Sequence, residues 1–195
     1  MAITLTQIRE LRGRTGAGVV DVKAALAESK GDVEQAITIL RKKGKASAAK
    51  KAAREVKEGV VASYIHSNQK LAVLVSVLCE TDFVARSPRF QQLARDIAMH
   101  IAAADPAVVS PDDVPAADVE AERQVALGQD AIVRKPKEIQ DKILVGKLKK
   151  FREERALLTQ PFVKDPSKTM ADVIHEAVSE LGENITIGEF KRLVV

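Results

Sequence analysis

Apolar residues recur at helical spacing through residues 1–44, which predicts three short helices packed as a bundle. Thr4 and Gln7 have the spacing of a capping box at the start of the first helix. Asp32 is placed to begin the third helix, and Gly44 is placed to end it. A bundle this small has a limited core, so we expect it to lean on the rest of the chain.

The second helix of the bundle follows a glycine-rich turn and carries an apolar residue on its outer side. Val19, Val22 and Leu26 share the face that we expect to point inward. Val20 lies off that face and is predicted to point outward. A single exposed valine carries little information, but the backbone beside a glycine-rich helix start can be approached closely.

The rest of the chain mixes strands and helices. Residues 59–79 read as a hairpin whose second strand, Leu71 to Cys79, is apolar nearly throughout and is predicted to be buried on both faces. Residues 184–195 alternate as a strand in which Gly188 marks a bulge. Further helices are predicted after Ser87 and over residues 116–129, 137–155 and 170–181. The predicted fold class is α+β, with a small antiparallel sheet packed with helices behind a three-helix bundle that resembles ubiquitin-associated domains.

The pattern divides the chain into an N-terminal module (1–44), a basic helical linker (45–57) and an α+β core (58–195). In and just before the linker, lysines and arginines greatly outnumber the one acid, Glu55. The conservative interpretation is a solvated helix that connects two domains. The alternative is an electrostatic docking face for an acidic partner or RNA.

Composition narrows the functional classes. The 195 residues are 46% hydrophobic and 30% charged with a net charge of +4, so binding to a polyanion is possible but not demanded. No apolar run approaches the roughly 20 residues that span a bilayer, and the first residues lack the pattern of a signal peptide. Cys79 is the only cysteine, which excludes an intrachain disulfide and fits a cytoplasmic protein.

A search for catalytic chemistry finds little. His66, His100 and His175 lie far apart in sequence and have no metal-ligand spacing, and His100 is expected on a helix surface or in a partly buried site. Cys79 in an apolar strand is expected to be a buried, inert thiol. No phosphate-binding loop is present. We therefore expect neither an enzyme nor a bound cofactor or metal.

Thr81-Asp82-Phe83-Val84 stands between the buried strand and the helix that Ser87 begins. An acidic residue beside a large aromatic at the exit of a strand is placed to protrude. The alternative is that Asp82 caps a turn and Phe83 folds back into the core. Spacing alone favours that alternative, because most Phe side chains are largely buried.

Two stretches resemble the signatures of bacterial elongation factor Ts, namely Leu11-Arg12-Gly13-Arg14-Thr15-Gly16-Ala17-Gly18-Val19-Val20-Asp21-Val22-Lys23 and Cys79-Glu80-Thr81-Asp82-Phe83-Val84-Ala85-Arg86. Shorter elements match in order at Lys50-Lys51-Ala52, Gly59, Gln160-Pro161-Phe162-Val163 and Gly182-Glu183-Asn184-Ile185. The similarity covers essentially the whole chain.

The resemblance implies a specific partner, the GTPase elongation factor Tu, in its GDP form and its nucleotide-free form. A factor of this family expels GDP and lets GTP enter. Asp82 and Phe83, flanked by Thr81 and Val84, match the pair that inserts beside the partner's Mg²⁺ site. Val19, Val20 and Lys23 match positions that contact the partner's nucleotide-binding domain. The valines stand where methionines are common in the family.

The chain is similar to the short form of the family, in which two single cores pair. The resemblance therefore implies a homodimer with a sheet or helix interface near the C-terminal strand. Some short members join their subunits through a cysteine near that end, but this chain has none there, so the dimer is expected to be non-covalent. No membrane contact is expected.

Two other functions compete with this interpretation. A basic RNA-binding or ribosome-associated protein would use residues 41–57 and would bind with steep salt dependence, although aromatic stacking platforms are scarce. An adaptor would use the three-helix module to bind another protein, on fold-level analogy alone. The resemblance favours the exchange factor, for which no direct nucleic-acid contact is expected.

Overall fold

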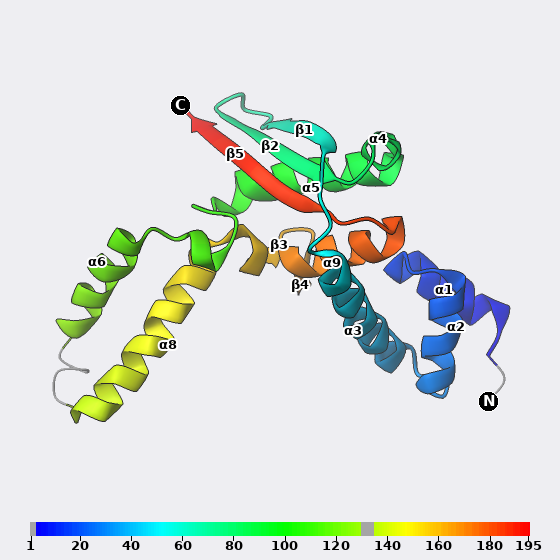
Figure 1. Cartoon of the computed structure of the whole chain (residues 1–195), viewed down its shortest axis with the longest axis horizontal. Coiled ribbons are helices and arrows are strands. Elements are labelled where there is room, and N and C mark those ends of the chain that lie inside the picture. The colour runs from blue at the N-terminus through cyan, green and yellow to red at the C-terminus, as the bar shows by residue number, and fades with distance from the viewer. Residues whose placement is uncertain (1–2, 130–134) are drawn as a thin grey trace. The chain divides into compact units, whose positions relative to one another are not determined.

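The computed structural model describes residues 3–129 and 135–195, and Figure 1 shows their helices and strands. The chain folds as two compact units, Met1–Met99 with Ala171–Val195, and His100–Met170. The elements are α1 (Leu5–Thr15), α2 (Val19–Glu28), α3 (Val33–Lys51), β1 (Glu58–Ile65), β2 (Leu71–Cys79), α4 (Asp82–Arg86), α5 (Pro88–Ala104), η1 (Pro111–Asp113), α6 (Ala116–Leu127), α8 (Lys137–Arg155), η2 (Leu157–Thr159), β3 (Pro161–Phe162), β4 (Asp165–Thr169), α9 (Met170–Leu181) and β5 (Thr186–Val194). The α+β class is confirmed.

The three N-terminal helices form the predicted bundle around a small aliphatic core. The Thr4 hydroxyl accepts a hydrogen bond from the Gln7 amide at 3.2 Å, and the Thr4 amide donates to the Gln7 side chain at 3.0 Å. This capping box starts α1 as predicted. The side chains that fill the core are Leu11, Val22, Ala25, Leu26, Ala36 and Leu40.

The predicted end of the third helix at Gly44 is wrong, because α3 continues to Lys51. Gly44 is buried in the middle of the helix, where an added Cβ would lie 3.8 Å from the His175 carbonyl oxygen. The glycine therefore faces the backbone of α9 and does not stop the helix. The division of the chain at residues 44 and 57 stays a prediction.

The three-stranded sheet has the order β1-β2-β5, and all its pairs are antiparallel. The predicted hairpin is confirmed, as is the bulge at Gly188, where the ladder between β2 and β5 shifts register opposite Ser76. The prediction that β2 is buried on both faces is wrong. Val73, Val75, Val77 and Cys79 are buried, whereas Leu74 on the other face is 52% exposed. Figure 1 shows α5 along one side of this sheet, so only one face needs to be apolar.

The second unit contains a pair of helices, α6 and α8, which pack through Ala126 and Leu144. His100, at the start of this unit, is fully buried, so the predicted surface or partly buried site is wrong. The Val163 amide donates to His100 Nδ1 at 3.3 Å, and Nε2 therefore carries the proton and faces Gln160 Oε1 at 3.2 Å. Burial lowers the pKa of His100, although the hydrogen bond to Gln160 opposes that shift. A neutral histidine with both nitrogens bonded is a structural group here.

Two glycines of the first unit give a matched test of the fold. An added Cβ at Gly59 would collide with the Val77 carbonyl group and lie 2.9 Å from Leu78 Cα, whereas one at Gly13 would meet no atom within 4 Å. We expect Gly59→Ala to lower the free energy of unfolding by about 2 to 3 kcal/mol. Gly13→Ala, within α1, should raise it by about 0.5 to 1 kcal/mol. Urea denaturation followed by circular dichroism measures both, and equal midpoints for the two variants would contradict the strand register.

Candidate functional site

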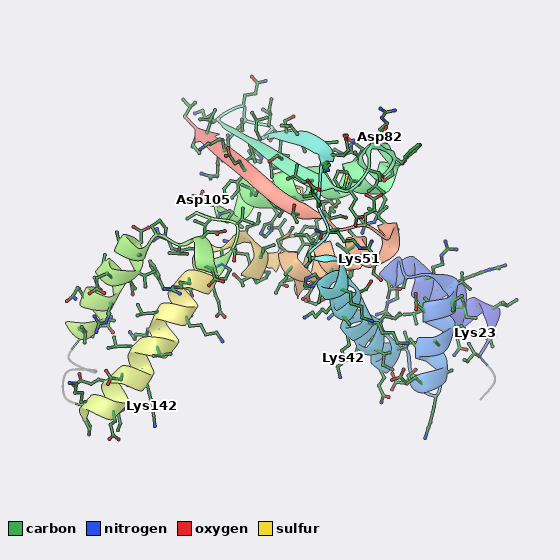
Figure 2. The ribbon with its side chains drawn as sticks, in the orientation of Figure 1. Lys23, Lys42, Lys51, Asp82, Asp105 and Lys142 are labelled. Atoms are coloured by element: carbon green, nitrogen blue, oxygen red, sulfur yellow. The ribbon has the colours of Figure 1, made fainter. Side chains whose placement is uncertain are left out.

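Residues Thr81–Val84, which we call the finger, leave the end of β2 and enter the short helix α4. The Thr81 hydroxyl caps this helix by accepting a hydrogen bond from the Val84 amide at 3.4 Å. Phe83 is 83% exposed, and the Asp82 carboxylate forms an ion pair with Arg86 at 3.2 Å. The alternative in which Phe83 folds back into the core is therefore wrong. Figure 2 shows Asp82 on the outer side of α4.

The base of the finger is bonded to the turn between α9 and β5. The Glu183 carboxylate accepts hydrogen bonds from the amides of Glu80 and Thr81, both at 3.0 Å. It also accepts the Thr81 hydroxyl at 2.6 Å. Glu183 belongs to a segment that resembles the family, but no local sequence pattern predicts this contact. The contact depends on the fold, because Glu183 and Thr81 are 102 positions apart in the chain.

A second set of bonds surrounds the same turn. The Asn184 amide donates to Glu80 Oε1 at 2.6 Å, and the Asn184 side chain donates to the carbonyl of Arg54 at 2.9 Å and to that of Ala52 at 3.4 Å. The Arg54 guanidinium lies 3.4 Å from Glu80 Oε1. Asn184 is buried, so these bonds satisfy a polar group that would otherwise be costly to enclose.

The second group of predicted site residues lies on α2. Val20 is 81% exposed as predicted, and Lys23, three residues further along α2, is also exposed (Figure 2). Val19 was expected on the inward face but is 49% exposed, because Val22, Ala25 and Leu26 already fill the core side of the helix. All three predicted contact residues of α2 are therefore accessible to a partner.

Both groups of site residues adjoin segments that contact α9 or the turn that follows it. Glu180 of α9 accepts a hydrogen bond from Arg89 at 2.6 Å. An added Cβ at Gly16, in the turn before α2, would lie 3.0 Å from the same Glu180 oxygen. Gly16 has φ +67°, a conformation that glycine adopts at little cost. The turn that precedes Val19 is thus fitted against α9.

The cations of the basic segment are partly engaged inside the first unit. Lys45 pairs with Asp172 at 2.8 Å, and Lys51 donates to the Ser47 hydroxyl at 2.9 Å. Lys51 also lies 3.5 Å from the carbonyl of Val178. The contacts with Asp172 and Val178 connect α3 to α9. Asp172 offsets the charge of Lys45, so this lysine would contribute less to a docking face for RNA.

Cys79 and the histidines offer no reactive constellation. Burial raises the pKa of the Cys79 thiol to about 11, and the negative charge of Glu183 adds to this effect. The neutral thiol donates a hydrogen bond to the Thr81 carbonyl at 3.2 Å. Within residues 3–129 and 135–195, no three His, Cys, Asp or Glu side chains are grouped to hold a metal ion. None of the helices described is both long and apolar enough to cross a bilayer.

Comparison with known proteins gives a consistent result. The chain matches the family Elongation factor TS over residues 17–195. It is similar to the elongation factor Ts of Thermosynechococcus vestitus, with 54% identity over 99% of this chain and 65% of that protein. It is 47% identical to the elongation factor Ts of Herpetosiphon aurantiacus over 100% of this chain and 98% of that protein. The corresponding protein of Rubrobacter xylanophilus is 50% identical, with 98% of both chains covered. The chain thus spans just under two thirds of the first relative and nearly all of the other two.

The exposure of Phe83 can be tested by a pair of phenylalanine substitutions. Phe83→Ala should change the free energy of unfolding by no more than about 0.5 kcal/mol, because the side chain is already in solvent. Phe90→Ala, in the buried face of α5, should lower it by about 3 to 5 kcal/mol. Thermal melts monitored by circular dichroism compare them. A large loss of stability in Phe83→Ala would place that ring in the core.

Proposed function

The chain belongs to the elongation factor Ts family, and we propose on that basis that it is a guanine-nucleotide exchange factor for the translation GTPase elongation factor Tu. It binds the GDP form of that partner, promotes loss of GDP, and leaves when GTP binds. The proposed activity makes and breaks no covalent bond, so the protein is not an enzyme in the usual sense. Its proposed location is the cytoplasm, where its partner works.

The observation that carries the proposal is the exposure of Phe83 beside Asp82 on a helix that is bonded at its base. A large aromatic side chain left in solvent forgoes the free energy that its burial would contribute, about 2 to 3 kcal/mol. That free energy becomes available when a partner covers the ring. It corresponds to about 30- to 150-fold in an equilibrium constant, which is enough to bias a partner between two states.

We assign the finger to the partner's Mg²⁺ and phosphate site. Mg²⁺ needs near-ideal octahedral oxygen coordination, so a small shift of its ligands weakens binding of the ion. A ring inserted beside that site displaces the backbone that holds the ligands. Loss of the ion leaves the phosphates of GDP less neutralised, and the nucleotide dissociates faster.

Exchange follows from reciprocal coupling between the finger and the nucleotide. If the finger favours the nucleotide-free state, then the nucleotide must weaken binding of the finger by the same factor. Binding of GTP therefore ejects the exchange factor. Val19, Val20 and Lys23 supply a second contact, with the partner's nucleotide-binding domain, which keeps the factor bound while GDP leaves.

Stopped-flow release of a fluorescent GDP from elongation factor Tu tests the proposal. The wild-type protein should accelerate release, and the double variant Asp82→Ala with Phe83→Ala should lose more than about tenfold of that acceleration, because it gives up the burial of the ring. Its melting temperature should stay close to that of the wild type, since both side chains lie outside the core.

The matched control is Val125→Ala, which truncates another exposed apolar side chain, on α6. It should release GDP as fast as the wild type. If saturating wild-type protein fails to accelerate release, the proposed function is wrong. If the double variant retains full activity, the assignment of the finger is wrong.

We also propose that the protein forms a non-covalent homodimer through the open face of the three-stranded sheet. Val61, Ile65, Leu74 and Leu193 are all exposed, and the strand register places them on the face opposite the buried one. An exposed apolar sheet face favours association with a second apolar surface. A second copy of the chain would supply an identical face, and pairing of the two would bury both.

Light scattering across a dilution series tests the dimer. The wild type should give twice the chain mass, and Leu74→Lys should give a single chain, because the charge would be buried without a partner. Val145→Lys makes the same change on the exposed side of α8 and should remain a dimer. A wild type with the mass of one chain at working concentration would refute the dimer.

A further inference from the structure

We propose that Glu183 is the positioning residue of the finger, which fixes the direction in which Asp82 and Phe83 project. The inference rests on the proposed function, and it concerns a residue that lies outside the finger. Glu183 acts through Thr81, which lies two residues after the end of β2 and is the N-cap of α4. Its carboxylate holds three donors of the adjoining segment at distances between 2.6 and 3.0 Å.

Both oxygens of the carboxylate are used. Oε2 accepts the amides of Glu80 and Thr81, and Oε1 accepts the Thr81 hydroxyl. Hydrogen bonds to an ionised acceptor are shorter and stronger than those between neutral groups. A carboxylate that accepts two consecutive amides and a hydroxyl therefore fixes the backbone and the side chain of Thr81 together.

The Thr81 hydroxyl passes this constraint to α4. Because its proton is directed to Glu183, its lone pairs are available to the Val84 amide, which donates to it at 3.4 Å. The Thr81 carbonyl accepts the Ala85 amide at 3.1 Å and the Cys79 thiol at 3.2 Å. The amide, hydroxyl and carbonyl of Thr81 are thus all bonded, although the residue itself is exposed.

The helix that carries the ring needs such support. α4 contains five residues, whereas isolated helices shorter than about 12 to 15 residues are marginal in water. Phe83 contributes little to its stability, because its ring lies in solvent. Without Glu183, α4 would keep its sequence and its exposure but would lose the bonds that hold its first turn in one orientation.

Glu183 is itself held in place by its neighbours. The next residue, Asn184, is buried and donates its amide to Glu80 and its side chain to the carbonyls of Ala52 and Arg54. The two segments are therefore joined by reciprocal hydrogen bonds: the Glu183 carboxylate accepts the Glu80 amide, and the Glu80 carboxylate accepts the Asn184 amide. The finger is thus anchored to a turn whose next residue is buried and hydrogen-bonded at both its amide and its side chain.

Titration of the exchange reaction distinguishes positioning from a general loss of structure. For Glu183→Ala we expect the maximal rate of GDP release to fall about tenfold at saturating protein. The reason is that the finger of this variant would occupy the orientation needed for insertion only part of the time. The half-saturating concentration should change by less than about twofold, since the contacts of α2 are intact. A purely structural role would lower the folded fraction, which raises the half-saturating concentration and leaves the maximal rate unchanged.

A conservative variant of Glu183 and a control variant are measured in the same titration. In Glu183→Gln the amide oxygen can still accept the two backbone amides, but the NH₂ group cannot accept the Thr81 hydroxyl, so its maximal rate should lie between those of the wild type and Glu183→Ala. Glu138→Ala, which removes an exposed glutamate from α8, should match the wild type. If Glu183→Ala melts far below the wild type, Glu183→Gln carries the test with the same readout.

A second measurement needs no GTPase. Amide hydrogen exchange followed by mass spectrometry should show faster exchange in residues 80–86 of Glu183→Ala than in the wild type, with other segments unchanged. Equal exchange in those residues, or an unchanged maximal rate of GDP release, would overturn the inference. An inactive wild type would instead refute the proposed function, and the exchange of residues 80–86 would still decide whether Glu183 holds the finger.

Discussion

The pairing of β5 with β2 is the constraint on which the arrangement of the site depends. Leu78 pairs with Thr186 and Val77 with Ile187, so the segment just before β5 must lie beside the segment just after β2. One of these segments carries Glu183, and the other carries the finger. A shift of the pairing by one residue would turn the buried side chains of β2 to the open face and would also separate the carboxylate from its three donors. The hydrophobic pattern of the sheet therefore sets the position of a polar contact at its end.

α9 extends this constraint to the N-terminal bundle. Asp172 pairs with Lys45, Glu180 bonds to Arg89 and faces Gly16, and the turn after the helix holds the finger. Gly16 has φ +67°, and an added Cβ would crowd the Glu180 carboxylate at 3.0 Å, so both the backbone conformation and the space favour a glycine in the turn before Val19. Both surfaces that we assign to the partner are thus connected to one helix within one compact unit. Two contacts held by one scaffold lose less freedom on binding than two independent ones.

Local patterns in the sequence predict the local structure well. The capping box at Thr4, the hairpin and the bulge at Gly188 each depend on residues close in sequence or on strand pairing within a simple sheet. The errors arise where distant segments decide the outcome. Gly44 is a residue type that commonly ends helices, but here it faces the backbone of α9 and α3 continues past it. The exposure of Phe83 contradicts the general rule that Phe side chains are buried, and it agrees with the family resemblance. The role of Glu183 depends on a contact between residues 102 positions apart, which no local pattern predicts.

If the finger inserts into the GTPase as we propose, the relative stiffness of the two proteins would decide which of them deforms. A movement of the backbone at the base of the finger would break the three hydrogen bonds to Glu183 and the hydrogen bond from the Cys79 thiol. Burial raises the pKa of that thiol, so it stays protonated and can donate. Charge-assisted bonds of this kind are costly to break without replacement. The ligands of a Mg²⁺ ion are also held tightly, but their geometry tolerates little displacement before binding of the ion weakens. In the exchange mechanism that we propose, a stiff finger would transfer the strain of insertion to the metal site of the GTPase, whereas a loose one would relax and leave the nucleotide bound.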